Sequence, residues 1–521
     1  MNISTLLRTT YSTDNNISNI KTPSMKKHSI LLLLYFSFIN IGIYAQENKF
    51  TPNKYKISLI SSIINETKAP LWQTSNKHGI IPEEDALIAE LEAYNTFHSK
   101  NNIFKAHIGA DIITSTSKTE NKLFPSQLYL GLQYHKLLIN IGIKHEITRY
   151  NGLSSTNGEI QWSNNARSMP GYNITFTDFF SLNNIGNLFR KGTKRSSDSK
   201  ILFNFEFGDY IANDNRYCGD RTLMHKDFFA VKILASPKTE ITCKLNRIIY
   251  WAGKSERLGT QPNGFRNYLR VIFQQNGGSD ANISDQINKL GNTLGAYNIN
   301  IKHTFNNDKK LTFYYSHPFE DRSGMRFQNG TDGVWGIYFE NKKSHKSYAI
   351  SHLIYEYINT TNQSGKAGSS FSAGDNYFNN GIYSSGHTFH KRTIGLPLMY
   401  PKTSKKGEIC MGIQNNTLIA HHIGLNGLVS EIPYTFLFTI SNNKGLNYNP
   451  YKIEAKNYSC LLQFNIAQKL HFLDSMFNMA LIQKHKLNFI LGATYSKNKE
   501  NFLPTNTWGA FLKLSFNFIT I

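Results

Sequence analysis

The stretch Leu512-Lys513-Leu514-Ser515-Phe516-Asn517-Phe518 alternates strictly between apolar and polar residues. Because successive side chains of a β-strand point to opposite faces, this period of two predicts a strand with one apolar and one polar face. The same alternation recurs in Phe104–Ile112, Leu128–Tyr134, Ile139–Ile143, Phe203–Phe207 and Tyr297–His303. Asn, Gly, Lys and Thr fill most of the polar positions.

Composition narrows the class of protein that could carry these strands. The chain has 521 residues, of which 13% are aromatic and 18% charged, and its mean hydropathy is −0.39. The aromatic content excludes a disordered chain. Only one apolar run approaches the length of a membrane-spanning helix, which argues against a helical membrane protein.

The N-terminal region has the pattern of a secretory signal peptide. Met25-Lys26-Lys27-His28 precedes an apolar stretch from Ile30 to Tyr44, and we expect cleavage between Ala45 and Gln46. Residues 1–45 are therefore predicted to be a signal peptide, with 1–24 as an upstream extension if translation starts at Met25. Their removal takes away four basic residues and one acid from 57 basic and 35 acidic residues, which leaves a net charge of +19.

Export combined with short alternating strands predicts a transmembrane antiparallel β-barrel of the outer membrane. A large extracellular β-protein is the alternative. The length after the signal peptide suffices for about 18 strands, and an even number is expected. We predict that residues 46–82 form a short periplasmic N-terminal segment and that the barrel occupies 83–521. Residues 83–98 fit either a helix or a strand, and a strand in a hairpin is favoured.

No motif of a known catalytic class is present in the sequence, so we expect no enzyme activity and no cofactor or metal. The adjacent pair His421-His422 would point to opposite faces of a strand, which is unsuited to holding one metal ion. An outer-membrane hydrolase is kept as a minor alternative.

The sequence contains more residues suited to binding a polysaccharide than to catalysis. Arginine holds carboxylates in a bidentate geometry, and aromatic rings stack on sugars. The candidate polysaccharide-binding residues are those that combine these properties in neighbouring blocks: Trp251, Arg266, Arg270, Asp321, Arg322, Arg326, Trp335, Asp375, Tyr377, Tyr383 and Arg392. The structural alternative is that inward charges form ion pairs in the lumen, while Trp and Tyr form an interfacial girdle.

Several blocks resemble the Wzi-type capsule assembly family of outer-membrane β-barrels, in its Bacteroidetes-like version. They span roughly residues 70–430 and are Ala69–Gly79, Trp162–Arg167, Asn213–Tyr217, Leu223–Lys226, Trp251–Gly253, Gln286–Asn292, Phe319–Gly324, Asp332–Gly336, Tyr355–Tyr357, Asp375–Gly386 and Arg392–Pro397. One departure is His387, which stands after Ser385-Gly386 where a Trp is expected.

The resemblance implies an 18-stranded barrel that binds and organises exported capsular or extracellular polysaccharide at the cell surface. The expected partners are an anionic polysaccharide, outer-membrane lipid with lipopolysaccharide, and the barrel-assembly machinery during insertion, with no nucleic acid. A general or sugar-selective diffusion porin is the alternative function. The two differ in whether the lumen is open.

Overall fold

A computed structural model describes most of the chain after residue 52. The described ranges are 53–181, 200–255, 257–306, 308–341, 350–364, 375–404, 409–466, 486–499 and 506–520. The predicted signal peptide, residues 1–45, and the predicted cleavage site at Ala45 and Gln46 lie outside them. No helix among these residues combines the length and apolar character needed to span a bilayer.

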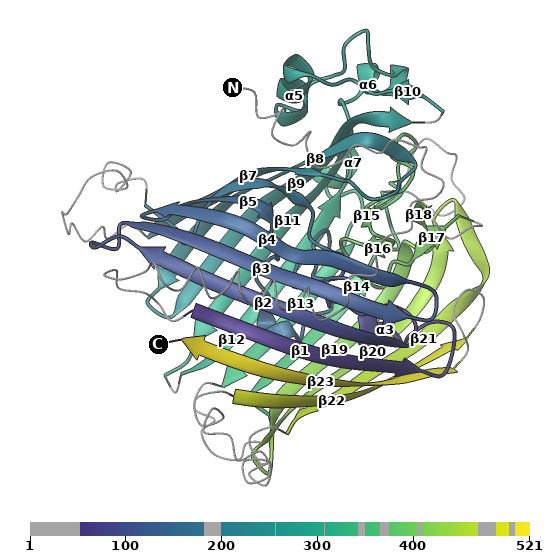
Figure 1. Ribbon diagram of the computed structural model, residues 1–521. Coiled ribbons are helices and arrows are strands. Elements are labelled where there is room, and N and C mark those ends of the chain that lie inside the picture. The colour runs from purple at the N-terminus through teal and green to yellow at the C-terminus, as the bar shows by residue number, and fades with distance from the viewer. Residues whose placement is uncertain are drawn as a thin grey trace, which may run out of the picture. The chain divides into compact units, whose positions relative to one another are not determined.

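The strands form one antiparallel sheet that closes on itself (Figure 1). Closure is made where β1 pairs with β2 on one side and with β23 on the other. Apart from the two-residue β10 (Gly259–Thr260), the sheet has 18 strands, as predicted. They are β1 Asn53–Ile64, β2 Ala86–His98, β3 Phe104–Ser117, β4 Asn121–Tyr134, β5 Leu137–Ile143, β6 Pro170–Phe176, β7 Ile201–Ile211, β8 Cys218–Ser236, β9 Thr239–Ser255, β11 Asn292–Thr304, β12 Lys309–Phe319, β13 Gly333–Asn341, β14 His352–Asn359, β19 Thr417–Val429, β20 Ile432–Leu446, β21 Asn449–Asn465, β22 Lys486–Lys499 and β23 Asn506–Thr520.

Short helices and strands occupy the connections. They are α3 Leu71–Thr74, the 3-10 turn Tyr150–Gly152, α5 Phe265–Ile272, α6 Ile283–Ile287, α7 Arg322–Met325, and the strands β15 Thr388–Phe389, β16 Arg392–Thr393, β17 Pro401–Thr403 and β18 Cys410–Ile413. β15 pairs with β16 and β17 with β18, outside the barrel sheet.

The predicted boundary of the N-terminal segment is wrong. Residues 46–82 were expected to precede the barrel, but Asn53–Ile64 is a barrel strand whose register with β23 runs from Asn53↔Thr520 to Ile64↔Gly509. Its inward positions include Ser58 and Ser62, both buried. If β1 were absent, strands β2 and β23 would each have an edge of unpaired backbone groups, which a bilayer cannot hydrate. The ambiguous segment 83–98 contains strand β2, which confirms the hairpin interpretation.

The two faces of the barrel wall differ as the alternation predicts. On β23, Leu512 and Phe516 are exposed on the outside, while Ser515 is buried and bonds Ser58 across the lumen face. Lys513 also points inward, where its Nζ donates to Glu90 at 2.6 Å. The side chain of Phe518 lies outside the described part. On β19, His421 contacts Tyr355 at the outer face while His422 is fully buried inside, so the two histidines do face opposite ways.

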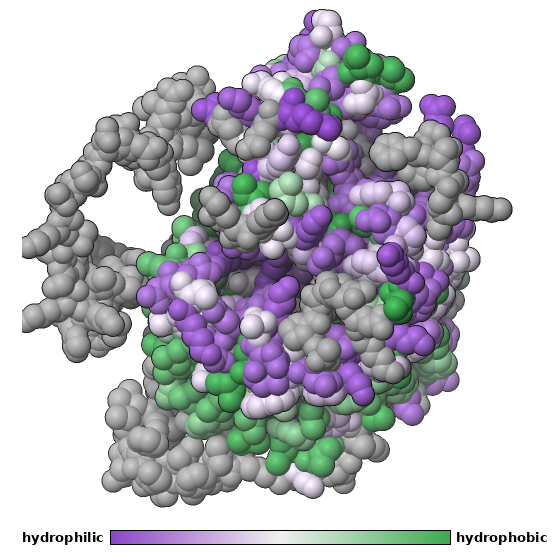
Figure 2. Space-filling model, turned by 90° about the vertical axis from the view of Figure 1, so that its right-hand side faces the viewer, coloured by the Kyte–Doolittle hydropathy of each residue, from purple (hydrophilic) through white to green (hydrophobic). Residues whose placement is uncertain are grey.

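The two ends of the barrel carry different connections. One end has most of the tight turns, such as 99–103, 135–136, 237–238 and 430–431, together with the longer connections 177–200 and 466–485. The other end has the long connections 65–85, 144–169, 256–291, 320–332 and 360–416. Outer-membrane barrels have short periplasmic turns and long extracellular loops, so the second end is the outer mouth. The mouth is hollowed and hydrophilic, whereas hydrophobic surface lies lower on the wall (Figure 2).

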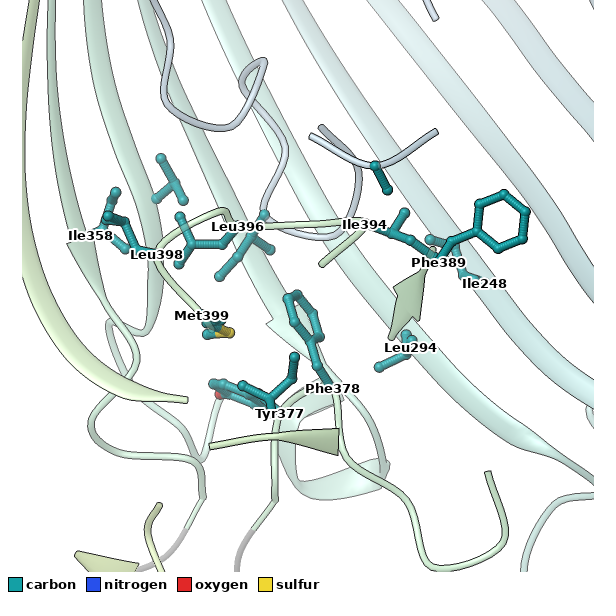
Figure 3. Packing of buried hydrophobic residues seen from close by; sticks show 14 of the residues in the cluster. Ile248, Leu294, Ile358, Tyr377, Phe378, Phe389, Ile394, Leu396, Leu398 and Met399 are labelled. Carbon is teal, nitrogen blue, oxygen red and sulfur yellow. The ribbon is translucent and has the colours of Figure 1, made fainter. Parts of the chain in front are cut away.

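The lumen contains a packed hydrophobic cluster. Three long connections, 65–85, 144–169 and the described part of 360–416, turn inward and pack against the wall strands. Figure 3 shows Leu398 of the last connection close to Ile358 of β14, with Leu396, Met399 and Phe378 in the same cluster. The core of this barrel therefore lies in its interior, at the level of the outer mouth.

Candidate functional site

The inward connections are tied to the wall by buried hydrogen bonds. Trp72 of α3 donates from Nε1 to Thr439 Oγ1 on β20 at 3.1 Å. Gln73, also of α3, donates to Ser62 of β1 at 2.8 Å. The backbone N–H of Leu71 reaches Ser496 of β22 at 3.2 Å. These bonds satisfy polar groups that could not otherwise be buried.

Glu356 of β14 anchors the second connection. Its carboxylate is fully buried and accepts hydrogen bonds from the hydroxyls of Ser154, Ser155 and Tyr314. The backbone N–H of Ser155 donates to the same carboxylate at 2.8 Å. A buried carboxylate is tolerated only when its oxygens are satisfied in this way, so the position of residues 153–156 is tightly specified.

His387 stands where the similar family is expected to have a Trp, and in this structure it holds buried segments together. The ring is fully buried, with Nδ1 2.9 Å from the Tyr250 hydroxyl and Nε2 2.7 Å from the Gln161 carbonyl. Burial lowers its pKa to about 4. The residue therefore joins the third connection to β9 and to the second connection as a neutral side chain, and it does not face the mouth.

A cleft of about 380 Å³ opens among these connections and the β3–β4 hairpin. We call it the mouth cleft. Its lining includes five cationic side chains, namely Lys68, Lys122, Arg167, Lys391 and Arg392. Three carboxylates, Glu83, Glu84 and Glu120, also line it. Phe124 and Tyr400 add aromatic surface, so the cleft combines an excess of positive charge with rings.

Two of the carboxylates are already engaged. Glu84 accepts bonds from Ser117 and Thr119, and Glu120 is paired with Lys122. The guanidinium of Arg167 lies 3.4 Å from the centre of the Phe124 ring, which holds it flat against the cleft wall. Burial, followed by repulsion from Arg392, lowers the pKa of Arg167 to about 10. Among the described residues, no carboxylate lies within ion-pair distance of Arg167 or Lys391.

Arg392 serves a different purpose from Arg167. Its guanidinium donates to the carbonyls of Ile81 at 2.9 Å and Thr74 at 3.4 Å. It therefore fastens the third connection to the first and forms the floor of the mouth cleft. Of the residues predicted from sequence, it is the one that lines this cleft.

The other predicted residues lie in separate places. Trp251 is on the outer face of β9, stacked on Tyr268 with ring centres 5.4 Å apart, beside α5, which carries Arg266 and Arg270. Trp335 is also on the outer face, stacked on Tyr315 at 3.7 Å, where an interfacial girdle is expected. The structure therefore does not bring these aromatic residues together with the arginines of the mouth.

The remaining predicted residues surround the 320–332 connection. Arg322 and Arg326 are exposed on or beside α7, and Asp321 caps that helix by accepting from the Ser323 N–H at 2.7 Å. The Tyr377 hydroxyl donates to Asp332 at 3.1 Å. Asp375 and Tyr383 are buried in the third connection, accepting from Ser364 and donating to the Ala252 carbonyl respectively.

Sequence reasoning missed most of the mouth cleft. Arg167 lies in a block that carried the family resemblance, yet nothing in its spacing distinguishes it from other arginines. Lys68 and Lys391 come from the first and third connections, Arg167 comes from the second, and Lys122 lies at the start of β4. Only the folding of those connections into one mouth brings the charges together.

Comparison with solved structures identifies the architecture. Wzi of Escherichia coli, an outer-membrane protein involved in group 1 capsule assembly, is 11% identical; the alignment covers 94% of this chain and 89% of that one, with a TM-score of 0.51. The Wzi structure is described as a carbohydrate-binding β-barrel. The chain folds as an outer-membrane β-barrel.

Other outer-membrane barrels align less closely. OprD of Pseudomonas aeruginosa is 8% identical, with 91% of this chain and 96% of that one covered and a TM-score of 0.45. OccK3 of the same organism is 8% identical, with 90% and 96% covered and a TM-score of 0.45. No protein-family model matches the sequence, and no curated protein matches it. The likeness is therefore one of fold.

Proposed function

We propose that the barrel binds an anionic capsular or extracellular polysaccharide at its mouth cleft and holds it at the cell surface without catalysis. The observation that carries the proposal is the cluster of cations from separate connections, with Arg167 and Lys391 lacking an ion-pair partner among the described residues. The fold shared with a carbohydrate-binding barrel supports the same class of ligand.

The chemistry of the cleft suits acidic sugars. A guanidinium binds a carboxylate through two parallel hydrogen bonds, and Arg167 keeps its donors at the cleft edge by stacking on Phe124. Lys391 and Lys68 are exposed and add positive potential around it. A repeating polymer can engage several barrels at once, so weak binding at each cleft is compatible with firm retention at the surface.

The test compares two double variants that remove the same charge. Arg167→Gln/Lys391→Gln changes the mouth cleft, and Arg322→Gln/Arg326→Gln changes exposed arginines of α7 on the same end of the barrel. Binding of alginate, a carboxylated polysaccharide, is measured on purified protein by calorimetry, with neutral dextran as the control ligand. We expect the cleft variant to bind alginate at least about tenfold more weakly, and the α7 variant to change affinity by only about twofold.

The dependence of alginate affinity on salt concentration provides a further test. Binding through exposed cations should weaken steeply between about 0.1 and 1 M salt, because the screening length falls from ~10 to ~3 Å. Equal loss of affinity in both double variants would place the ligand elsewhere on the mouth. No binding of any acidic polysaccharide by the unaltered protein would overturn the proposal.

A diffusion porin is the second candidate, and one observation favours it. A second cavity of about 430 Å³, the inner cavity, lies along the same wall and is lined by Lys56, Glu92 and Lys513 among others. Ile80 and Ile81 line both this cavity and the mouth cleft, so this short segment separates the two spaces. A displacement of the segment would connect them into a polar route through the barrel.

A further inference from the structure

The 256–291 connection folds back onto the outside of the barrel. Tyr268 of α5 donates from its hydroxyl to Asp209 of β7 at 2.6 Å. Arg247 of β9 donates to the carbonyl of Ile272, at the end of α5, at 3.2 Å. Asp209 and Arg247 lie on the outer face, because their strand neighbours Tyr210 and Ile248 pack into the interior cluster.

A small hydrophobic cluster fastens this contact. Val271 of α5 and Leu290 pack with Ile249 and Trp251 on the outer face of β9. Each of these side chains is less than a tenth exposed. The buried side of α5 is therefore its side toward the barrel, and the opposite side has no covering element among the described residues.

The uncovered side is strongly apolar. Phe265, Leu269 and Phe273 follow one another at intervals of four residues and share one side of the helix. Phe265 and Phe273 are 75% and 67% exposed, and Ile283 and Ile287, the first and last residues of α6, are 75% and 71% exposed. Single exposed apolar residues are ordinary, but five in one short segment mark an interaction surface. Figure 2 shows hydrophobic surface among hydrophilic surface at the top of the molecule, over this segment.

Charge on the segment has one dominant sign. Within the described part of 254–291, the exposed charged side chains are four basic ones and one acidic one, namely Lys254, Arg257, Arg266, Lys289 and Asp280. Arg266 is on α5 itself, next to the apolar side. A short helix with an apolar side flanked by cations is the pattern of a segment lying in the interface of an anionic membrane.

The outer wall next to this segment is grooved. A depression of about 480 Å³ is lined on the outer face by Ile174, Phe205, Phe207, Phe229 and Leu245. Phe229 is 52% exposed and pairs with Leu245, so both belong to the surface that faces lipid. The groove is also lined by the ion pair between Asp227 and Arg247. These two residues face each other on β8 and β9, two residues along each strand from the Phe229 and Leu245 pair.

We propose that this groove binds an acyl chain of an anionic outer-leaflet lipid, and that the apolar side of α5 and α6, which faces away from the barrel, lies in the surrounding membrane interface. The acyl chain lies against Phe205, Phe229 and Leu245, beside the end of α5. The exposed cations of the segment contact the lipid phosphate. The occupant is assigned from two observations: the groove continues the lipid-facing wall, and Arg247 joins the groove directly to the end of α5.

The first test measures the environment of the segment in the full-length protein reconstituted into phosphatidylcholine vesicles containing phosphatidylglycerol. Phe273 or Ile287 is replaced by cysteine and spin-labelled in a background in which the two cysteines that are not buried, Cys243 and Cys460, are serine; the buried Cys218 and Cys410 remain. Leu130→Cys on β4 is the lipid-facing control and Lys391→Cys the aqueous control. We expect labels at 273 and 287 to collide with oxygen as frequently as the label at 130 does. Collision rates matching those at 391 would overturn the proposal.

The second test measures lipid binding directly. The variant Phe205→Ser/Phe229→Ser/Leu245→Ser, which changes the groove itself, is titrated with phosphatidylglycerol in detergent, and bound lipid is counted by native mass spectrometry. We expect at least about tenfold weaker binding than for the unaltered protein, because three apolar contacts are lost.

The control variant is Leu128→Ser/Leu130→Ser/Leu132→Ser on the outer face of β4, which removes a similar apolar area away from α5. It should keep the high-affinity lipid. An equal loss of phosphatidylglycerol affinity in both variants would show that the lipid binds anywhere around the barrel wall, which would contradict a distinct site. A gel shift on heating verifies that each variant remains a folded barrel, so a failure to fold is recognised as such.

Discussion

Neighbouring residues of β23 meet opposite environments, and this difference can be tested by a single charge. Leu514 pairs with Leu59, which is 46% exposed on the lipid-facing side, whereas Ser515 lines the inner cavity. Leu514→Arg should lower the free energy of unfolding by about 2–4 kcal/mol if the residue lies near the bilayer midplane. Ser515→Arg should cost far less, because the cavity has room and Glu90 and Glu92 line it. Urea unfolding in vesicles measures both; equal losses would refute the face assignment.

Glu356 offers a second test at the residue scale. Replacement by Gln keeps its shape but turns an amide NH₂ toward groups that donate hydrogen bonds. We expect a loss of about 1.5–3 kcal/mol in the local stability of the 144–169 connection, since bonds to a charged group are removed. Faster protease cleavage within 150–160, with an unchanged gel shift of the barrel, would show it. Glu340→Gln, at a less buried position on β13, is the matched control.

At the scale of elements, the third connection is expected to respond to pH. Burial, then repulsion from Asp321, raises the pKa of Asp375 to about 7. Two carboxyl groups of the 320–332 connection accept hydrogen bonds from the third connection: burial raises the pKa of Asp332 to about 6 and that of Glu320 well above its usual range. Because the folded connection binds protons that the unfolded one releases, its stability is greatest at low pH and is lost as pH rises through 6 to 7.

Hydrogen exchange of residues 376–386, corrected for the intrinsic rate, should therefore be about tenfold slower at pH 5 than at pH 8. Asp375→Asn should slow exchange at pH 8 and flatten the pH dependence. Faster exchange at pH 5 would have the opposite sign and contradict the proposed protonation.

The arginines predicted to bind polysaccharide lie on different connections and have different roles. The sequence predicted that Arg322, Arg326 and Arg392 belong to one polysaccharide site. In the structure, Arg392 hydrogen-bonds the third connection to the first, whereas Arg322 and Arg326 are exposed on or beside α7. Replacing all three arginines together would also release the first connection from Arg392, so it would not isolate polysaccharide binding. The Arg167/Lys391 pair is the better probe of the mouth cleft.

For the whole molecule, the packed interior predicts a small conductance. Ile80 and Ile81 separate the mouth cleft from the inner cavity, and Ile81 is buried with Ile60, Ile88 and Ile113. In planar bilayers the unaltered protein should show little current, and Ile80→Ala/Ile81→Ala should conduct measurably more. The control Ile57→Ala/Ile63→Ala removes the same atoms from exposed positions on β1 and should behave as the unaltered protein. A large steady current through the unaltered barrel would favour the porin function.

The sequence by itself determined the wall of this barrel. Alternation is a local signal, because lipid outside and polar groups inside act on each successive residue of a strand. Leu512 and Ser515 could therefore be assigned to faces, and about 18 strands could be expected. β1 was missed because its outward residues Ile57, Leu59 and Ile63 share the strand with Ile60, an apolar residue that points inward and blurs the period.

Only the tertiary structure decided the mouth and the interior. Trp72 meets Thr439, His387 meets Tyr250, and Arg392 reaches Ile81, each across more than one hundred residues of sequence. No periodicity encodes such contacts, because they depend on how loops of different lengths fold into a shared lumen. The same reason explains why Trp251 lies outside the wall under α5, and why Lys68, Arg167 and Lys391 come together in one cleft.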